Sequence, residues 1–140
     1  MREILFKAKR IDNGEWVEGY LFDDGFENGR MFVGGLVIEE YHGTACDDWS
    51  ITGIDFYEVD PSTICQCTGL NDKNGNLIFE NDIVRIKYDD DFSEVGWIKY
   101  SNCGVRYNFV FGTEIYSIDD SCDIEVIGNI FDNPELINEL

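Results

Sequence analysis

The pair Cys65 and Cys67 is the first candidate for metal chemistry in this sequence. Side chains alternate along a strand, so both thiols would lie on one face and could bind zinc together. Further ligands would have to come from the other cysteines or the single histidine: Cys46, Cys103, Cys122 and His42. Zinc sites commonly leave two or more residues between paired cysteines, and buried free cysteines pack as small apolar groups. We therefore favour a packing role over a metal site for this pair.

His42 and Cys46 are the residues from which a nucleophilic pair could be built. Such a pair needs hydrogen-bond contact and a third group that orients the base. A separation of four residues aligns two side chains only on a helix, and Gly43 and Thr44 disfavour a helix there. The sequence also has no glycine-rich phosphate loop and no nucleophile elbow. We expect no catalytic residues and no cofactor, and we classify the chain as a non-enzyme.

Asp72, Asn74 and Gly75 have the spacing of the third, fifth and sixth positions of a calcium-binding EF-hand loop, two ligand positions and the turn glycine. The residues that would then occupy the first and last ligand positions are Leu70 and Asn81, and neither is a carboxylate. No flanking helices are expected either. The pattern is typical of a polar turn in which glycine adopts positive φ, so no metal ligand is assigned.

Acidic residues are the most unusual feature of the sequence, with 29 acids, 10 bases and a net charge of −19 among 140 residues. The clusters Asp89-Asp90-Asp91 and Asp119-Asp120 are expected in loops and form a candidate interaction surface. Such a surface repels phosphate groups, which disfavours direct binding to nucleic acid or to an anionic membrane. The charge either keeps the protein soluble or imitates the phosphates of duplex DNA.

The five cysteines and the first ten residues indicate the compartment. An odd cysteine count suits a reducing environment better than a disulfide framework. The opening residues carry no apolar stretch typical of a signal peptide, and no run is long enough for a membrane helix. These features predict a cytoplasmic protein.

Short alternating runs predict an all-β fold of two small subdomains, residues 1–60 and 61–140. A hairpin is expected at Asn13-Gly14, and the second subdomain is expected to form an SH3-like barrel. Residues 41–55 have weak periodicity and suggest a long loop or an irregular strand, while Gly34-Gly35 suggests a bulge or turn. Asn133 and Pro134 predict the start of a short C-terminal helix.

Two segments, Val59–Val84 and Glu125–Leu136, resemble the YopX family of bacteriophages and prophages. The first carries Thr68-Gly69-Leu70 and ends in Glu80-Asn81-Asp82-Ile83-Val84; the second carries Ile127-Gly128-Asn129 and Asn133-Pro134-Glu135-Leu136. The resemblance implies an all-β fold and a phage or prophage context, with no established activity. Asn81 stands where the family usually has glycine, and asparagine also tolerates positive φ. The motif residues are expected to be structural: Gly69, Asp72, Gly75, Glu80, Asp82, Gly128, Asn129 and Pro134.

Three functional hypotheses follow from these features. The leading one is a non-enzymatic accessory protein that acts through protein–protein contacts with an unidentified partner. The second is an acidic DNA mimic that inhibits a host nuclease or DNA-binding protein. The third is a metal-dependent enzyme that uses the acidic clusters. Self-association is a further expectation, since small β proteins have strand edges to cover.

Overall fold

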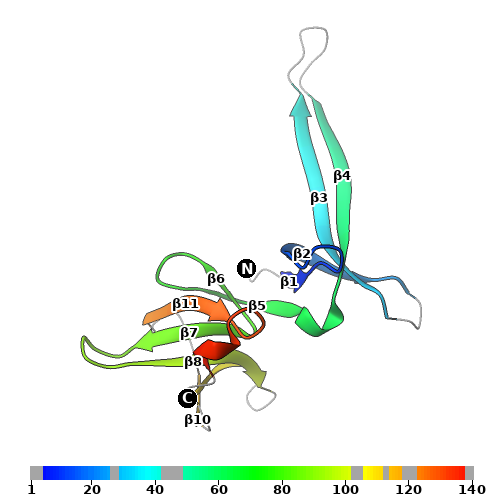
Figure 1. The fold of residues 1–140 in the computed structure, drawn as a ribbon. Coiled ribbons are helices and arrows are strands. Elements are labelled where there is room, and N and C mark those ends of the chain that lie inside the picture. Colours follow the sequence, from blue (N-terminus) through cyan, green and yellow to red (C-terminus); the bar gives the residue numbers. More distant parts are fainter. Residues whose placement is uncertain are drawn as a thin grey trace. The chain divides into compact units, whose positions relative to one another are not determined.

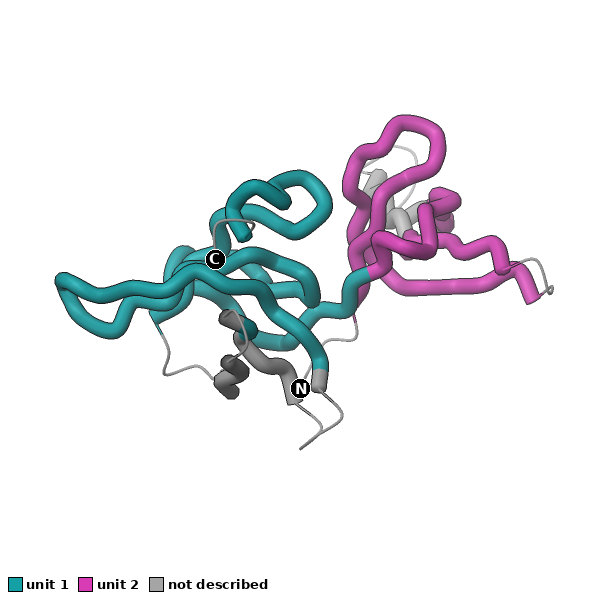
Figure 2. Tube along the Cα trace, turned by 60° about the horizontal axis from the view of Figure 1, so that its bottom comes forward, with its two compact units in different colours: residues 1–4, 65–140 teal, residues 5–64 magenta. Residues whose placement is uncertain are grey.

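The computed structural model describes residues 5–25, 29–41, 49–101, 106–111, 114–117 and 123–137. It divides into two compact units (Figure 2): Leu5–Ile64 form unit 2, and the rest of the chain belongs to unit 1. Nearly all regular structure in the described residues is antiparallel strand, which confirms the all-β prediction. No helix in the described part of the chain is long and apolar enough to cross a membrane.

Unit 2 is an antiparallel meander of four strands followed by one 3-10 turn. The strands are β1 (Phe6–Lys9), β2 (Trp16–Asp23), β3 (Met31–Tyr41) and β4 (Trp49–Val59), and the turn is η1 (Pro61–Thr63). Among the described residues, the apolar core of the unit consists of three fully buried side chains, Ala8, Val33 and Val59. Half-buried apolar side chains pack around them: Val17, Leu21, Met31 and Ile64.

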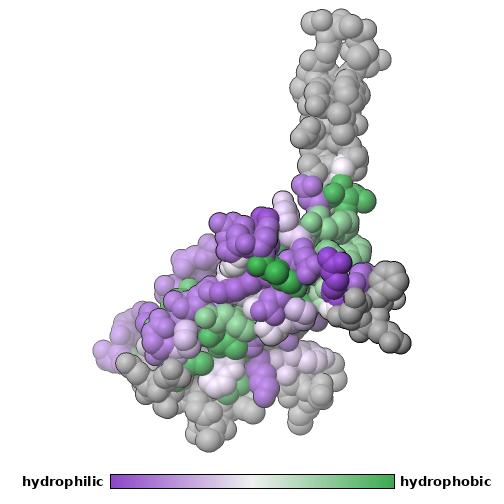
Figure 3. Space-filling model, turned by 45° about the vertical axis from the view of Figure 1, so that its right-hand side comes forward, coloured by the Kyte–Doolittle hydropathy of each residue, from purple (hydrophilic) through white to green (hydrophobic). Residues whose placement is uncertain are grey.

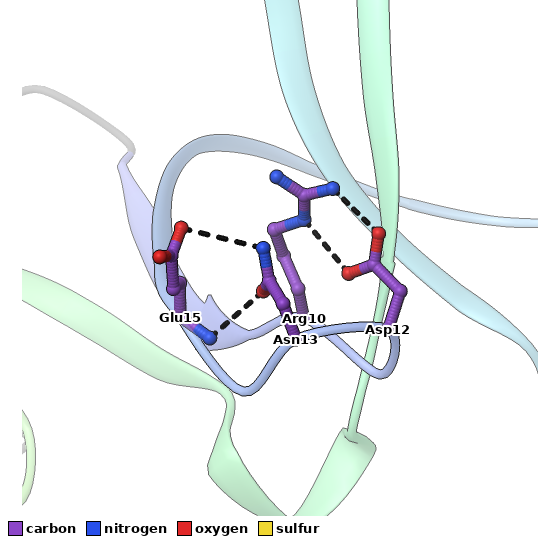
Figure 4. A network of polar contacts seen from close by, with 4 residues as sticks. All are labelled: Arg10, Asp12, Asn13 and Glu15. Atoms are coloured by element: carbon purple, nitrogen blue, oxygen red, sulfur yellow. Dashed lines mark hydrogen bonds and ion pairs between the residues drawn. The ribbon is translucent and has the colours of Figure 1, made fainter.

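The hairpin between β1 and β2 turns where Asn13-Gly14 predicts it, with Gly14 at φ 71°. The Asn13 side chain accepts the Glu15 N–H at 2.9 Å, and Arg10 donates to both oxygens of Asp12 (Figure 4). The Arg10 guanidinium also lies 4.0 Å from the centre of the Tyr57 ring. Its hydrogen bond lowers the pKa of Asp12 and raises its own. The turn is therefore fastened to the neighbouring strand β4.

Strands β3 and β4 extend well past the other two strands of the unit (Figure 1). Their pairing runs without interruption from Met31 and Val59 to Tyr41 and Trp49, whereas β2 pairs with β3 only as far as Gly34. Beyond that point the described residues form a two-stranded ribbon. The interpretation of Gly34-Gly35 as a bulge or turn is thus wrong.

Of the two alternatives for residues 41–55, a long loop or an irregular strand, the structure shows strand where it describes them, since Tyr41 ends β3 and Trp49 to Asp55 belong to β4; residues 42–48 lie outside the described residues. Glycine at position 34 has a steric reason. A Cβ built there would lie 1.8 Å from the Asp55 carbonyl oxygen of β4. The two backbones approach too closely for any side chain.

Unit 1 contains a hairpin and a five-stranded antiparallel sheet of order β10-β9-β8-β7-β11. The hairpin strands are β5 (Cys65–Asn71) and β6 (Leu77–Phe79). The sheet strands are β7 (Asp82–Lys87), β8 (Ser93–Ser101), β9 (Arg106–Phe111), β10 (Glu114–Ser117) and β11 (Asp123–Asn129). Five aliphatic residues form the core of this unit: Ile78, Val84, Ile86, Ile98 and Ile124.

Two expectations for this unit differ from the structure. The described strands of the sheet stay open, with β10 and β11 at its edges, and do not close into a barrel. The described part of the expected C-terminal helix is one 3-10 turn, η2 (Pro134–Leu136). Asn133 precedes this turn but does not cap it, because its side-chain oxygen instead accepts the N–H of Asn129 at 3.3 Å.

Candidate functional site

The acidic cluster Asp89-Asp90-Asp91 occupies the loop between β7 and β8, as its composition predicts. Asp89 accepts the N–H of Asp91 at 2.8 Å, and the loop closes where the Tyr88 N–H donates to the Phe92 carbonyl at 3.0 Å. Both aromatic rings at the loop base stack with centres 5.4 Å apart. The three carboxylates are exposed on this compact turn.

This loop borders a hollow of about 150 Å³ that also contains three basic side chains, those of Lys73, Arg85 and Lys87. Lys73 approaches Glu125 at 3.1 Å, and Lys87 approaches Asp90 at 3.5 Å. The hollow therefore carries both signs of charge, and the loop does not present a purely acidic face. Asp119 and Asp120, the other acidic pair of the candidate surface, lie outside the described residues.

The Asp72 carboxylate accepts three backbone hydrogen bonds. Its Oδ1 accepts the N–H groups of Asn74 and Asn76, each at 2.9 Å, and its Oδ2 accepts that of Val126 on β11 at 3.0 Å. Burial raises the pKa of Asp72, but the N–H groups of Val126, Asn76 and Asn74 more than offset it, so the pKa lies below its ordinary value. The carboxylate fastens the β5–β6 turn, with Gly75 at φ 84°, to the edge strand.

The segment Glu80-Asn81-Asp82 joins β6 to β7 through a tight turn. Asp82 is 2% exposed and accepts the Phe79 N–H at 2.9 Å, so its carboxylate caps the turn. Glu80 accepts the N–H of Gln66 on β5 at 2.7 Å. Asn81 has φ 67°, which explains why asparagine can stand where the family usually has glycine. Gly69 on β5 also has positive φ, at 84°.

The second motif turns the chain after β11. Asn129 accepts the N–H groups of Phe131 and Asp132 at 3.0 and 2.9 Å, and Pro134 begins η2. A Cβ on Gly128 would lie 2.5 Å from the Asn133 side-chain oxygen, so a larger residue here would displace the Asn133 side chain. The Ile130 N–H donates to the Asn81 carbonyl at 3.0 Å. The two motifs therefore meet, and their contacts are those of a structural junction.

Cys65 and Cys67 are both fully buried. The Asn81 side-chain amide donates to Cys65 Sγ and the Gly69 N–H to Cys67 Sγ, each at 3.4 Å. The described part of the chain contains no group of three or more histidine, cysteine or acidic side chains placed to hold a metal ion. The other candidate ligands and the nucleophilic pair lie outside the described residues: His42, Cys46, Cys103 and Cys122. The metal-dependent enzyme hypothesis stays a prediction.

Unit 2 exposes an aromatic face that the sequence analysis did not single out. Tyr20 is 58% exposed, Phe22 44%, Ile54 60% and Phe56 42%, and the half-buried Phe32 lines a hollow together with Phe22 and Phe56. The register places Phe22 opposite Phe32 on the neighbouring strand, and the rings of Phe22 and Phe56 meet edge to face at 4.7 Å. These five residues are called the aromatic face.

Charged residues of both signs border the aromatic face, since the Arg30 guanidinium lies 5.5 Å from the centre of the Phe32 ring and is paired with Glu58 at 2.6 Å. Asp23 lines a hollow of about 340 Å³ with Phe22, Phe32 and Phe56. Glu18 and Asp55 line a second of about 420 Å³ beside Tyr20. Neither hollow has a basic residue in its described lining. Hydrophobic residues gather near the described base of the β3–β4 ribbon (Figure 3).

The sequence does carry a signal for this face. Strand β2 alternates Val17, Leu21 on the core side with Tyr20, Phe22 on the other, so it is apolar on both faces. A strand of an antiparallel sheet with only one covered face normally has polar residues on the other. Exposed apolar patches of this kind are typical of binding surfaces, and the aromatic residues on the exposed side of β2 are the sequence signal for one.

The fold and these surfaces define an all-β protein of two antiparallel units, with polar turns in one and an exposed aromatic face in the other. Residues 26–138 match the family model described as YopX protein, and the chain belongs to the YopX family. The chain is also similar to the crystal structure of protein EF1440 from Enterococcus faecalis. The two share 23% identity and a TM-score of 0.59 over 98% of this chain and 99% of that one, a likeness of fold. A comparison with curated proteins gave no match.

Proposed function

We propose that this protein is a non-enzymatic accessory protein of a phage or prophage, which acts in the bacterial cytoplasm by binding another protein through the aromatic face. One observation carries the proposal: four large apolar side chains of one sheet face are 42% to 60% exposed. Contiguous exposed apolar surface rimmed by polar residues is characteristic of protein interaction sites, in which aromatic residues are enriched.

The experiment is a tagged pull-down from a lysate of the bacterial host, treated with nuclease and washed at low and high salt. Phe22→Ala is expected to remove a captured protein because aromatic anchors dominate binding energy at interfaces. The matched control is Phe92→Ala in unit 1, which removes a ring of similar exposure at 52% and should leave capture unchanged. Equal capture by wild type and Phe22→Ala would overturn the proposal.

The DNA-mimic hypothesis stays a second proposal, supported by the net charge of −19 and by the exposure of Asp89, Asp90 and Asp91. The nearby Lys73, Arg85 and Lys87 weaken it, because they break the run of negative charge. It predicts that a basic DNA-binding protein is captured at low salt and lost at high salt. Replacing the three aspartates with asparagine should abolish that capture, and unchanged capture would remove the loop from this hypothesis.

Small SH3-like barrels also use a carboxylate to cap the backbone of a diverging turn. The hydrogen bond from the Phe79 N–H to Asp82 before β7 therefore supports an SH3-like relationship for unit 1. The turn adds nothing to the functional proposal, since its hydrogen bonds are internal to the unit.

A further inference from the structure

We propose that the partner binds by strand addition: an extended segment of it pairs with the outer edge of β4 at Ile54 and Phe56 and lays alternate apolar side chains on the aromatic face. This inference rests on the proposed function and specifies how the same surface is used. An extended peptide that joins a sheet edge gains affinity from main-chain hydrogen bonds and specificity from alternate side-chain pockets.

The direction of the backbone groups on β4 follows from two hydrogen bonds. The carbonyl of Glu58 accepts the Ile11 N–H at 3.0 Å on the side of β4 away from β3, and the Asp60 N–H donates to Lys9 on that same side. Successive residues in an antiparallel strand point their N–H and C=O groups to opposite neighbours. Because the β3–β4 register is continuous, Phe56 and Ile54 also direct their backbone N–H and C=O groups away from β3.

The chain itself already pairs with part of this edge. Arg10 forms an antiparallel bridge with Val59, and this short pairing ends at Ile11. Within the described residues, no strand continues along the edge past Ile54 and Phe56. Unprotected edges of this kind invite pairing with another chain. A partner segment would extend the line that Arg10 begins.

The two edge residues also carry side chains of the aromatic face. Ile54 and Phe56 are two positions apart, so their side chains lie on the same face of β4. Phe56 meets Phe22 edge to face on this side of the sheet. A strand added at the edge would place its own alternate side chains next to Ile54 and Phe56, where cross-strand pairs form.

Charge identifies the chemistry of the occupant. Glu18 lies on the face of β2 that carries Tyr20, and Arg30 beside Phe32 is paired with Glu58 at 2.6 Å. The net charge of the chain, −19, favours a basic partner. A segment that alternates apolar residues with lysine or arginine complements both the aromatic face and this charge. A second copy of this chain would bring a further net charge of −19 to the contact, which opposes self-pairing. The structure therefore favours a basic, apolar, extended segment of a different protein.

The test uses the full chain, labelled with nitrogen-15, and a short synthetic peptide that alternates lysine with valine. Bound peptide should slow amide hydrogen exchange at Ile54 and Phe56 by about tenfold or more, because their N–H groups gain acceptors. The amides of Asp55 and Tyr57 already face β3 and should change little. A peptide of the same composition with its lysines and valines in two separate blocks controls for charge alone.

Two further reagents remove hydrogen bonds without altering charge. Methylating the peptide nitrogens that would face β4 should abolish binding. In the protein, Ile54→Pro removes one outward N–H, and proline is tolerated at a sheet edge on that side. It should weaken binding about threefold to tenfold more than Ile54→Ala, which keeps the N–H. The methylated peptide keeps the test valid even if the proline variant does not fold.

Binding of the alternating peptide, with protection at Ile54 and Phe56 and loss on methylation, would support strand addition. Binding that survives methylation, or that leaves these two amides unprotected, would overturn strand addition while leaving the proposed function intact. Failure of the alternating peptide to bind better than the block peptide would overturn it too. Strand addition by a different protein would also be overturned if sedimentation showed a dimer without peptide and the amides of Ile54 and Phe56 were protected in that dimer. Only the pull-down with Phe22→Ala decides the proposed function.

Discussion

Unit 1 buries two carboxylates and satisfies them with backbone N–H groups, whereas unit 2 gathers aromatic rings on one exposed sheet face. Asp72 and Asp82 are 6% and 2% exposed and fix turns, while Phe22 and Phe56 are more than 40% exposed on an open sheet face. Asp72 and Asp82, which belong to the family motifs, are the buried carboxylates of unit 1. The motif carboxylates hold turns of unit 1, whereas the surface that we propose for a partner lies in unit 2.

The largest effect is expected where unit 2 has the least room. Gly34→Ala would place a Cβ 1.8 Å from the Asp55 carbonyl oxygen, which forces β3 and β4 apart. We expect the free energy of unfolding of unit 2 to fall by about 3 kcal/mol. Amide exchange measured residue by residue should show faster opening of β3 and β4, with unit 1 unchanged.

The matched control for this prediction is Gly53→Ala in the same pair of strands. A Cβ at position 53 meets no atom within 4 Å, so stability should stay close to that of the wild type. Equal losses in the two variants would show that the Gly34 contact is not the limiting one. Faster exchange throughout unit 1 would show that the two units do not unfold independently.

The next effect concerns the buried carboxylate of unit 1. Asp72→Asn replaces an acceptor of the Val126 N–H with an amide that cannot accept equally on both atoms, and it should cost about 2 kcal/mol at pH 7. The folded pKa of Asp72 is lowered, so its contribution is present above the unfolded pKa near 4 and is lost as pH falls through the folded value.

Urea unfolding at pH 7 and at pH 3 checks this prediction. The difference between wild type and Asp72→Asn should be large at pH 7 and smaller at pH 3, because acid removes the charge that the variant already lacks. A difference that is the same at both pH values would mean that the carboxylate charge does not stabilise the turn.

The smallest effect is expected at the exposed loop of the same unit. Lys87→Ala removes a contact of 3.5 Å to Asp90, whose side chain is fully exposed, and should change the free energy of unfolding by less than about 0.5 kcal/mol. Urea unfolding at low and high salt measures it. A loss comparable to that of Asp72→Asn would show instead that the hollow beside the loop is an organised site.

Local turn chemistry was the part of the fold that could be predicted from sequence. Asn13-Gly14, Gly75 and Asp82 act within a few residues of their own positions, and asparagine at position 81 adopts the positive φ that its type permits. Such features depend on short-range sterics and hydrogen bonds, which the residue type encodes directly.

The long ribbon and the aromatic face could not be predicted in the same way. Gly34 and Gly35 look like a break in the chain, yet Gly34 exists to let a distant strand approach, and only the pairing with Asp55 reveals it. Apolar alternation does not say which face of a strand is covered, so it does not single out Tyr20 and Phe22 as exposed. Both features depend on long-range packing.

The order of the strands in unit 1 has a consequence for synthesis. On one side β7 pairs with β8, which follows it directly in the chain. On the other side it pairs with β11, so Asp123, the partner of Lys87, is synthesised much later. A chain emerging from the ribosome can form the meander of unit 2 by successive local hairpins, since β1 to β4 pair in sequence order. Unit 1 then keeps an open edge on β7 until β11 appears. The Asp72 carboxylate also lacks the Val126 N–H until β11 is made, so the arrival of β11 both covers the open edge of β7 and completes the hydrogen bonds of this buried carboxylate.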